Sequence, residues 1–251
     1  MSYNLAVPGP SVAGLPMPTL SASEAAALET PGLIERISAR DPAYSETGLA
    51  YYGGVSGGLW RGRGGAFADK QSLGRPSVRF NAGGFAYVTG QLALPPSYTI
   101  YVLGRVNAAK SFNSLFSSLS QTDARAWMCM DAARTLRLIH GAGQVGTTAT
   151  VADGASFVAM ASFDLATLTG AVSLNSLGGL VTGALPIQKG SPVSSIGGIQ
   201  STDNDTTALH TLNGWIEEVW IYSGSHGLDG ADDTRAAIIG HLAAYGGVTL
   251  S

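Results

Sequence analysis

The sequence predicts an all-β fold, most simply a β-sandwich or barrel, and three observations lead to this prediction. Glycine supplies 34 of the 251 residues, nearly twice the roughly 7% that is usual in soluble domains. Charged residues make up only 12%, about half of the usual share. From residue 76 onwards, short β-rich runs recur about every 8–12 residues with turn signals between them. This composition excludes helical bundles and disordered chains, which carry much more charge, and favours a turn-rich sandwich.

The first 45 residues are assigned to an attachment segment that precedes the sandwich. Residues 1–20 are rich in Pro, Gly, Ser and Ala, and such a composition favours an extended path. We prefer an arm that lies along a partner protein to the alternative, a flexible tail. The prolines that define this arm are Pro8, Pro10, Pro16 and Pro18. Ser21 or Ser23 can cap a short helix that ends at Pro31, and residues 33–40 are expected to form a further helical turn.

Residues 46–251 are assigned to the sandwich itself. Its first part, 48–65, is dense in glycine and is expected to form loops and short irregular strands. Regular strands are expected at residues 77–81, 85–89, 98–106, 125–130, 135–139, 155–164, 170–175 and 213–223. Gly83 and Gly84, between the first two of these strands, predict a hairpin. A capping helix is predicted over Thr234–Tyr245, because acidic residues precede it, an apolar stripe runs along it and two glycines follow it.

Four passages carry a resemblance to a known family. They are RPSVRFNAGGFAYV (75–88), LPPSYTIYVLGRV (94–106), ASFDLATLTGAVSLN (161–175) and LNGWIEEVWIYSGSHGLDGADDTRAAIIGHLAAYGG (212–247). Their order resembles the laminin-G-like group of the concanavalin A-like lectin/glucanase superfamily, of the kind found in bacteriophage structural proteins. The resemblance covers residues 55–250, and its last passage is the most specific because strand, loop and helix occur there together. The resemblance implies a two-sheet antiparallel jelly-roll sandwich. In this family, its concave face and the loops at the rim of that face often bind glycans or proteins.

The superfamily that the sequence resembles includes glucanases, which makes its acidic residues candidates for a catalytic pair. A retaining glycosidase needs two carboxyl groups about 5–5.5 Å apart on one surface. Glu217 and Glu218 are neighbours in a predicted strand, so they are expected to point to opposite faces. We expect one of them to be solvated and the other to bond a neighbouring loop. The chain is therefore predicted not to be an enzyme, and an atypical glycosidase that uses Glu218 is the less favoured alternative.

Other catalytic patterns are missing from the sequence. The histidines, His140, His210, His226 and His241, are far apart and lack the spacing of metal ligands. Cys129, the single cysteine, lies in an apolar strand and is expected to be buried and inert. One cysteine also forms no disulfide within the chain, so the fold does not depend on an oxidising compartment.

Two groups of residues are candidate binding sites. Aromatic and basic side chains flank the glycine-dense segment and could stack on a sugar or a protein, although packing beneath the loop is the alternative. These residues are Tyr51, Tyr52, Trp60, Arg61 and Arg63. Asp203, Asn204 and Asp205 place three oxygen donors in one loop, which suits calcium. A plain polar hairpin loop is the alternative there, and no other cofactor is expected.

The leading functional hypothesis is a non-enzymatic bacteriophage virion surface protein, a capsid decoration, spike or tail-fibre component. Its expected partners are other virion proteins, further copies of itself and, in one interpretation, a host-surface glycan. A net charge of −3 without a basic patch argues against nucleic acid, and no segment is expected to insert into a membrane. The N-terminus does not resemble a secretory signal, so we expect synthesis in a bacterial cytoplasm and display on the virion. The rival hypothesis is a carbohydrate-binding adhesin or receptor-binding module.

Overall fold

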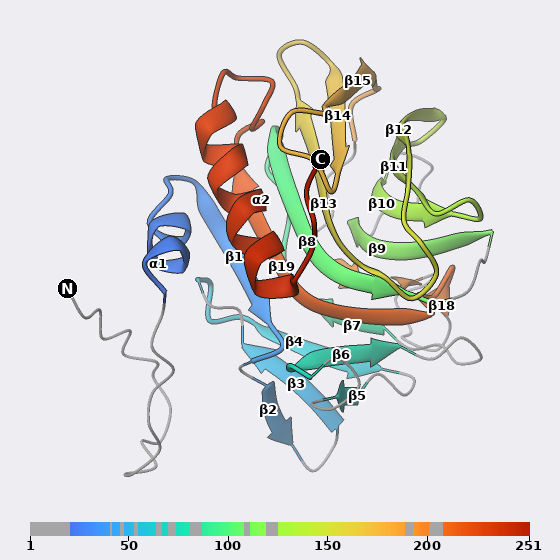
Figure 1. Cartoon of the computed structure of the whole chain (residues 1–251). Helices are drawn as coiled ribbons and strands as arrows, with labels where there is room; N and C mark the ends of the chain where they lie inside the picture. The colour runs from blue at the N-terminus through green and yellow to red at the C-terminus, as the bar shows by residue number, and fades with distance from the viewer. Residues whose placement is uncertain are drawn as a thin grey trace.

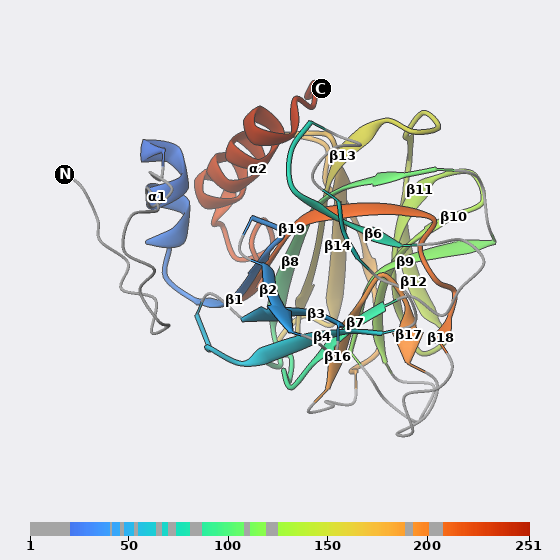
Figure 2. The same ribbon diagram turned by 90° about the horizontal axis from the view of Figure 1, so that it is seen from below.

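The computed structural model describes residues 21–40, 42–45, 48–52, 55–63, 67–69, 74–80, 87–107, 111–118, 125–188, 193–200 and 208–251. Two antiparallel sheets lie face to face, and two helices lie on the outer surface of one of them (Figures 1 and 2). The predicted all-β sandwich with a C-terminal helix is therefore confirmed.

Sheet A has eight strands, and each pairs antiparallel with its neighbours. Seven of them follow one another in the order β15 (Val181–Ala184), β14 (Thr169–Leu174), β13 (Ser156–Asp164), β8 (Tyr98–Val106), β19 (Gly214–Ser223), β6 (Ser77–Phe80) and β5 (Phe67–Asp69). The eighth strand, β1 (Leu33–Ser38), pairs with the second half of β19.

Sheet B has nine strands, and a separate two-stranded hairpin is not part of it. Their order is β12 (Gly143–Thr150), β11 (Thr135–His140), β10 (Ala126–Asp131), β9 (Phe112–Ser118), β16 (Ser194–Ile196), β7 (Tyr87–Gly90), β4 (Leu59–Arg63), β3 (Gly48–Tyr52) and β2 (Pro42–Ser45). The hairpin consists of β17 (Ile199–Gln200) and β18 (Ala208–Leu209).

The core follows from the alternation of side chains along the strands. In β8, Ile100 and Val102 face sheet B and belong to the main core, while Tyr101 and Leu103 face outwards. The outward residues are covered by helix α2 (Asp232–Gly246), so they are just as buried as the inward ones. Burial of each such large side chain stabilises the fold by about 1.5–3 kcal/mol. Sheet A therefore has apolar packing on both faces, which explains why β8 is a nearly continuous apolar run.

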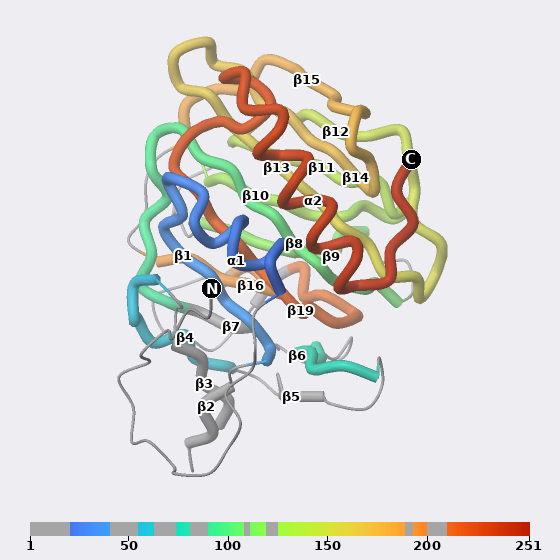
Figure 3. Tube along the Cα trace, turned by 60° about the vertical axis from the view of Figure 1, so that its left-hand side comes forward, coloured from blue at the N-terminus to red at the C-terminus, as the bar shows by residue number. Residues whose placement is uncertain are grey.

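Helix α1 (Ala22–Leu28) lies beside α2 on the outer face of sheet A (Figure 3). Its N-cap is Ser21, whose hydroxyl accepts a hydrogen bond from the backbone N–H of Glu24 at 3.1 Å, as the sequence predicts. Helix α2 ends at Gly247, which adopts the left-handed conformation with φ of 62°. Both helices were predicted, and both are confirmed.

Two local predictions are wrong. Residues 33–40 form strand β1 instead of a helical turn, because Ile37 enters the core and the backbone of β1 finds a partner in β19. The sandwich therefore includes two strands, β1 and β2, that lie before the predicted boundary at residue 46. Gly83 and Gly84 do not join a hairpin either, since β6 belongs to sheet A and β7 belongs to sheet B.

Candidate functional site

The acidic pair Glu217 and Glu218 lies at a β-bulge in β19. The pairing of β19 with β8 skips Glu217, which is therefore an extra residue in the strand. An extra residue shifts the alternation of side chains by one position, and accordingly Ile216 and Val219 both lie in the core. The two glutamates between them both reach partners on the outer face, where α2 lies. The prediction that they point to opposite faces is wrong because it assumed an unbroken strand.

The carboxylate of Glu218 accepts hydrogen bonds from four side chains. Ser38 Oγ and Arg40 Nε donate to Oε1 at 2.7 and 3.0 Å. Arg36 Nε and Trp220 Nε1 donate to Oε2 at 3.3 and 2.9 Å. Two of these donors are guanidinium groups from β1 and from the residues that follow it. Glu218 is thus neutralised and covered, which is the arrangement expected of a structural acid.

Glu24 of helix α1 completes this group, which we call the buried charge network: Glu24, Arg36, Arg40 and Glu218. Arg36 Nη2 donates to Glu24 Oε1 at 2.8 Å, and Arg40 donates to both of its oxygens. Burial raises the pKa of Glu24, but the hydrogen bond and charge of Arg40 and the charge of Arg36 outweigh it and hold the pKa below its usual value. The network therefore ties α1 to the sheet.

Glu217 forms a separate ion pair with Arg75. Both Nε and Nη2 of Arg75 donate to this carboxylate, and Nη2 also donates to the carbonyl of Gly246 and to Ser156 Oγ. Burial, helped by the charge of Glu218, raises the pKa of Glu217 even though Arg75 opposes this effect. Glu217 and Glu218 are each only 1% exposed. The expectation that one of them is solvated is therefore wrong.

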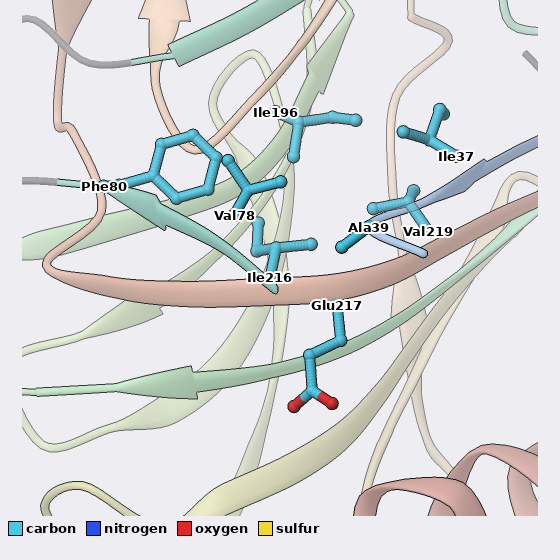
Figure 4. A pocket seen from close by; sticks show the side chains of 8 residues that line it. All are labelled: Ile37, Ala39, Val78, Phe80, Ile196, Ile216, Glu217 and Val219. Carbon is cyan, nitrogen blue, oxygen red and sulfur yellow. The ribbon is translucent and has the colours of Figure 1, made fainter. Parts of the chain in front are cut away.

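A small pocket lies on the opposite side of β19, between the sheets. Its lining residues are Ile37, Ala39, Val78, Phe80, Ile196, Ile216, Glu217 and Val219. Figure 4 shows that the carboxylate of Glu217 points away from the apolar side chains that define the pocket. The carboxylate of Glu217 therefore does not point into this pocket, which is an apolar cavity in the core.

Among the predicted ligand-binding residues, the structure describes the side chains of Trp60 and Arg61. Trp60 is 1% exposed and belongs to the main core, and its indole N–H donates to Glu35 Oε2 at 3.4 Å. Its ring thus follows the packing alternative and leaves no face for a sugar. Arg61 is exposed. Tyr51 pairs with Trp60 through the backbone of β3 and β4, while the side chains of Tyr51, Tyr52 and Arg63 lie outside the described residues.

The remaining predicted sites also fall outside the described residues. These are the calcium candidates Asp203, Asn204 and Asp205 and the arm prolines Pro8, Pro10, Pro16 and Pro18. Within the described ranges, no group of three or more His, Cys, Asp and Glu side chains is placed to hold a metal ion. Neither helix in the described part of the chain has the length and apolar character that crossing a membrane requires.

The histidines have different hydrogen-bond partners, and the cysteine is buried. His140 donates from Nδ1 to the carbonyl of Pro186 at 2.9 Å, so its Nε2 accepts from the hydroxyl of Tyr98 at 2.5 Å. His226 Nδ1 contacts the Tyr101 hydroxyl. Cys129 is fully buried, and burial raises the pKa of its thiol well above the usual range. The prediction of a buried cysteine is confirmed.

Sequence analysis missed a group of rings on the outer face of sheet B, at β9 and β10, which we call the aromatic cluster: Phe112, Trp127 and His210. The ring centroid of Trp127 lies 5.0 Å from those of Phe112 and of His210, and Phe112 meets His210 edge-on at 5.5 Å. Phe112 begins β9, Trp127 lies near the start of β10, and His210 directly follows β18. Because the three residues come from different parts of the chain, no short sequence motif indicates that their rings are in contact.

The backbone and a hydroxyl group hold this cluster in place. Trp127 Nε1 donates to Ser114 Oγ at 3.1 Å, and the backbone N–H of Ser114 donates to the carbonyl of His210 at 3.0 Å. His210 is exposed, whereas Phe112 is half-buried and Trp127 is 9% exposed. Burial and the positive charge of Arg125 lower the pKa of His210, which keeps its ring neutral at pH 7. The cluster thus offers an aromatic edge beside a neutral imidazole and a cation.

Comparison with known proteins identifies a shared fold but no family for this chain. No family model matches the chain, and no curated protein matches its sequence. Solved structures do match. The botulinum neurotoxin type G receptor-binding domain has a TM-score of 0.56 at 15% identity, over 82% of this chain and 51% of that chain. A botulinum neurotoxin type C structure, described for cell entry that depends on two ganglioside molecules, has a TM-score of 0.59 at 10% identity, over 84% and 51%.

A Trypanosoma rangeli sialidase in complex with sialic acid also matches, with a TM-score of 0.59 at 14% identity, over 86% of this chain and 33% of that chain. This chain therefore spans about half of the neurotoxin binding domains and a third of the sialidase. At 10–15% identity, the similarity shows a shared lectin-like β-sandwich and does not by itself carry an activity.

Proposed function

We propose that this chain is a non-enzymatic, lectin-like binding module that recognises a saccharide through the aromatic cluster. The observation that carries the proposal is the contact of three rings on the outer face of sheet B, with His210 exposed beside Trp127. Ring faces and edges provide the apolar contact that the C–H face of a sugar needs, and neighbouring polar groups fix its orientation. The imidazole of His210 and the guanidinium of Arg125 supply those hydrogen bonds.

The fold neighbours support a glycan as the class of ligand. One neurotoxin neighbour is described with two ganglioside molecules, and the sialidase is in complex with sialic acid. Because fold alone does not determine ligand, these neighbours support the proposal only together with the aromatic cluster.

The non-enzymatic part of the proposal rests on the state of the two acids in β19. Glu217 is occupied by Arg75, and Glu218 is occupied by Arg36 and Arg40. A general acid or nucleophile must reach its substrate within hydrogen-bond distance. Both carboxylates are instead buried beneath the helices that cover sheet A. Turnover of a polysaccharide that disappears in the Glu218→Gln variant would contradict this part.

At a finer level, we propose that the module belongs to the laminin-G-like group and is displayed on a bacteriophage virion, with residues 1–20 as the attachment segment. The composition of those residues supports this role, and α1 supports it by tying the chain to the sandwich where they end. The test is deletion of residues 1–20 with α1 retained. The truncated protein is expected to fold but not to attach to the particle, and unchanged incorporation would overturn the proposed arm.

A glycan array tests the binding role. The wild-type protein is expected to give reproducible hits that weaken about tenfold or more in His210→Ala and Phe112→Ala, a loss equivalent to about 1.4 kcal/mol or more. Arg61→Ala is the matched control, because Arg61 is exposed and belongs to the other predicted site. Circular dichroism checks that each variant is folded. Binding that survives both cluster variants but is lost in Arg61→Ala would move the site to β4, and an array without hits would refute the proposal.

A further inference from the structure

Exposed apolar side chains concentrate around strand β15. Of the five large apolar residues that are exposed in the described part of the chain, four lie on or beside the β14–β15 hairpin. These four are Leu168 (40% exposed), Leu177 (41%), Val181 (37%) and Ile187 (59%). The fifth, Val55, lies elsewhere. Scattered exposed apolar residues are normal, but a group of them on one edge indicates a contact surface.

Strand β15 is also the end of sheet A, so one side of its backbone is unpaired in the sheet (Figure 1). The N–H of Leu185 donates to the carbonyl of Leu168 at 2.9 Å. Because hydrogen-bonded pairs alternate along an antiparallel ladder, Gly183 is the next residue that bonds to β14. Thr182 and Ala184 consequently direct their N–H and C=O groups away from β14, and both residues are exposed.

The strand and its flanks lack charged side chains, and the strand lacks proline, two of the features that usually prevent an edge strand from pairing with another chain. Edge strands are normally protected by charged side chains, by proline or by a covering loop. Residues 165–188 contain no Asp, Glu, Lys, Arg or His, and Pro186 lies beyond the end of the strand. An uncharged strand can face its own copy without the repulsion that like charges cause across a sheet. The occupant that this edge suits is therefore an identical strand.

The apolar residues have the distribution that a two-fold contact requires. Leu177 and Val181 lie at one end of β15, and Leu168 and Ile187 lie at the other. A two-fold axis at Gly183 pairs Thr182 with the partner's Ala184 and brings the two ends of the strand together. In such an isologous contact, each apolar end meets the other end of the second copy.

We propose that β15 pairs antiparallel with β15 of a second copy of this chain about a two-fold axis at Gly183, so that sheet A continues across a homodimer. At the axis, the two Gly183 residues face each other as a pair without mutual hydrogen bonds, where backbones come closest, and glycine has no side chain to obstruct them. The strand is short, so the dimer is expected to be concentration-dependent.

Sedimentation velocity of the full chain at about 1–100 μM tests the proposal, a range that suits weak contacts of this size. Thr182→Pro removes an N–H that points away from β14, so no hydrogen bond within sheet A is broken. An edge strand tolerates proline at such a position. Val181→Lys places like charges at both ends of the contact. Each variant is expected to raise the dimer dissociation constant about tenfold or more.

Val55→Lys is the matched control, since Val55 is an exposed apolar residue away from this edge, and it is expected to leave the dimer unchanged. Thermal unfolding of each variant confirms that it is folded. A wild-type protein that stays monomeric throughout the range would overturn the proposal. A dimer that persists unchanged in Thr182→Pro and Val181→Lys would also overturn it, as would one that Val55→Lys disrupts equally.

Discussion

The hydroxyl of Tyr222 donates a hydrogen bond of 2.9 Å to the carbonyl of Ala27, 195 residues earlier in the chain. Tyr222 is fully buried in the apolar layer between sheet A and the helices, and Ala27 belongs to the same layer. This bond and the buried charge network hold α1 from two sides. Helix α1 has only seven residues, too few to be stable alone in water, so these tertiary contacts are what keep it helical.

Tyr222→Phe is therefore expected to loosen α1 without unfolding the sandwich. It removes one hydrogen bond, which costs about 0.5–1.5 kcal/mol, and it leaves the ring in place. Hydrogen exchange followed by mass spectrometry should show faster exchange in residues 22–28 and little change in β8. Uniformly faster exchange throughout both sheets would show instead that Tyr222 supports the whole fold.

Glu218→Gln is expected to lower the free energy of unfolding by about 3–5 kcal/mol. The substitution leaves Arg36 and Arg40 with one carboxylate, that of Glu24, where they had two, and breaking a buried ion pair from one side carries a penalty of this size. Urea unfolding measures it. Glu29→Gln is the control, because Glu29 is exposed at the end of α1 and its loss should change stability by less than about 0.5 kcal/mol. Equal effects of the two variants would contradict the structural role of the network.

Stability is expected to fall as the pH drops from about 7.5 to about 5.5, a range on either side of the ordinary histidine pKa of 6.5. Burial lowers the pKa of all four histidines in the folded protein below this value. As the pH falls through 6.5, the unfolded chain binds protons that the folded chain does not, which favours unfolding. Glu217, whose pKa is raised, acts with the opposite sign, but it is one group against four.

Two variants separate the contributions to this pH dependence. His140→Gln, at a fully buried position, should flatten the change in unfolding free energy over this range of about two pH units. His210→Gln should alter it less, because His210 is exposed and screened by solvent. Urea unfolding at three pH values measures both. A stability that stays constant across this range in the wild-type protein would refute the prediction.

Two glycines of the same helix should respond to alanine with opposite signs. At Gly240 an added Cβ meets no atom within 4 Å, so Gly240→Ala is expected to stabilise the protein by about 0.5–1 kcal/mol. At Gly246 the added Cβ would overlap Cδ1 of the fully buried Leu103, and Gly246→Ala is expected to destabilise by about 1–3 kcal/mol. Thermal unfolding compares them. Effects of the same sign would show that the packing of α2 on β8 differs from that described.

The sequence predicted the strands that are richest in apolar residues. The strand expected at 98–106 coincides with β8, and the strand expected at 213–223 begins one residue before β19. These segments are rich in Val, Ile, Tyr and Trp, whose preference for strands agrees with their burial. Strands β9, β12, β15 and β16 were missed. Their Ser, Thr and Gly residues favour turns when considered locally, and only pairing with neighbouring strands makes them extended.

The candidate site was less predictable than the fold. The bulge at Glu217 lies in the pairing of β19 with β8, and nothing in the local residues reveals it. The aromatic cluster depends on side chains of β9 and β10 meeting the chain where it returns after β18, which is a tertiary contact. Trp60 was predicted as a ligand-binding residue, with packing as the alternative, and its burial in the core favours the alternative.

The pairing of β1 with β19 determines when the fold can be completed. Leu33 faces Tyr222 and Ser38 faces Glu218, so an early segment must wait for one that a ribosome makes nearly 190 residues later. Until then, the central strand β8 has an open edge, and Arg36 and Arg40 lack the carboxylate of Glu218. Folds dominated by such distant pairings form in milliseconds to seconds. Nascent chains of this protein therefore depend on being kept from one another until synthesis passes β19.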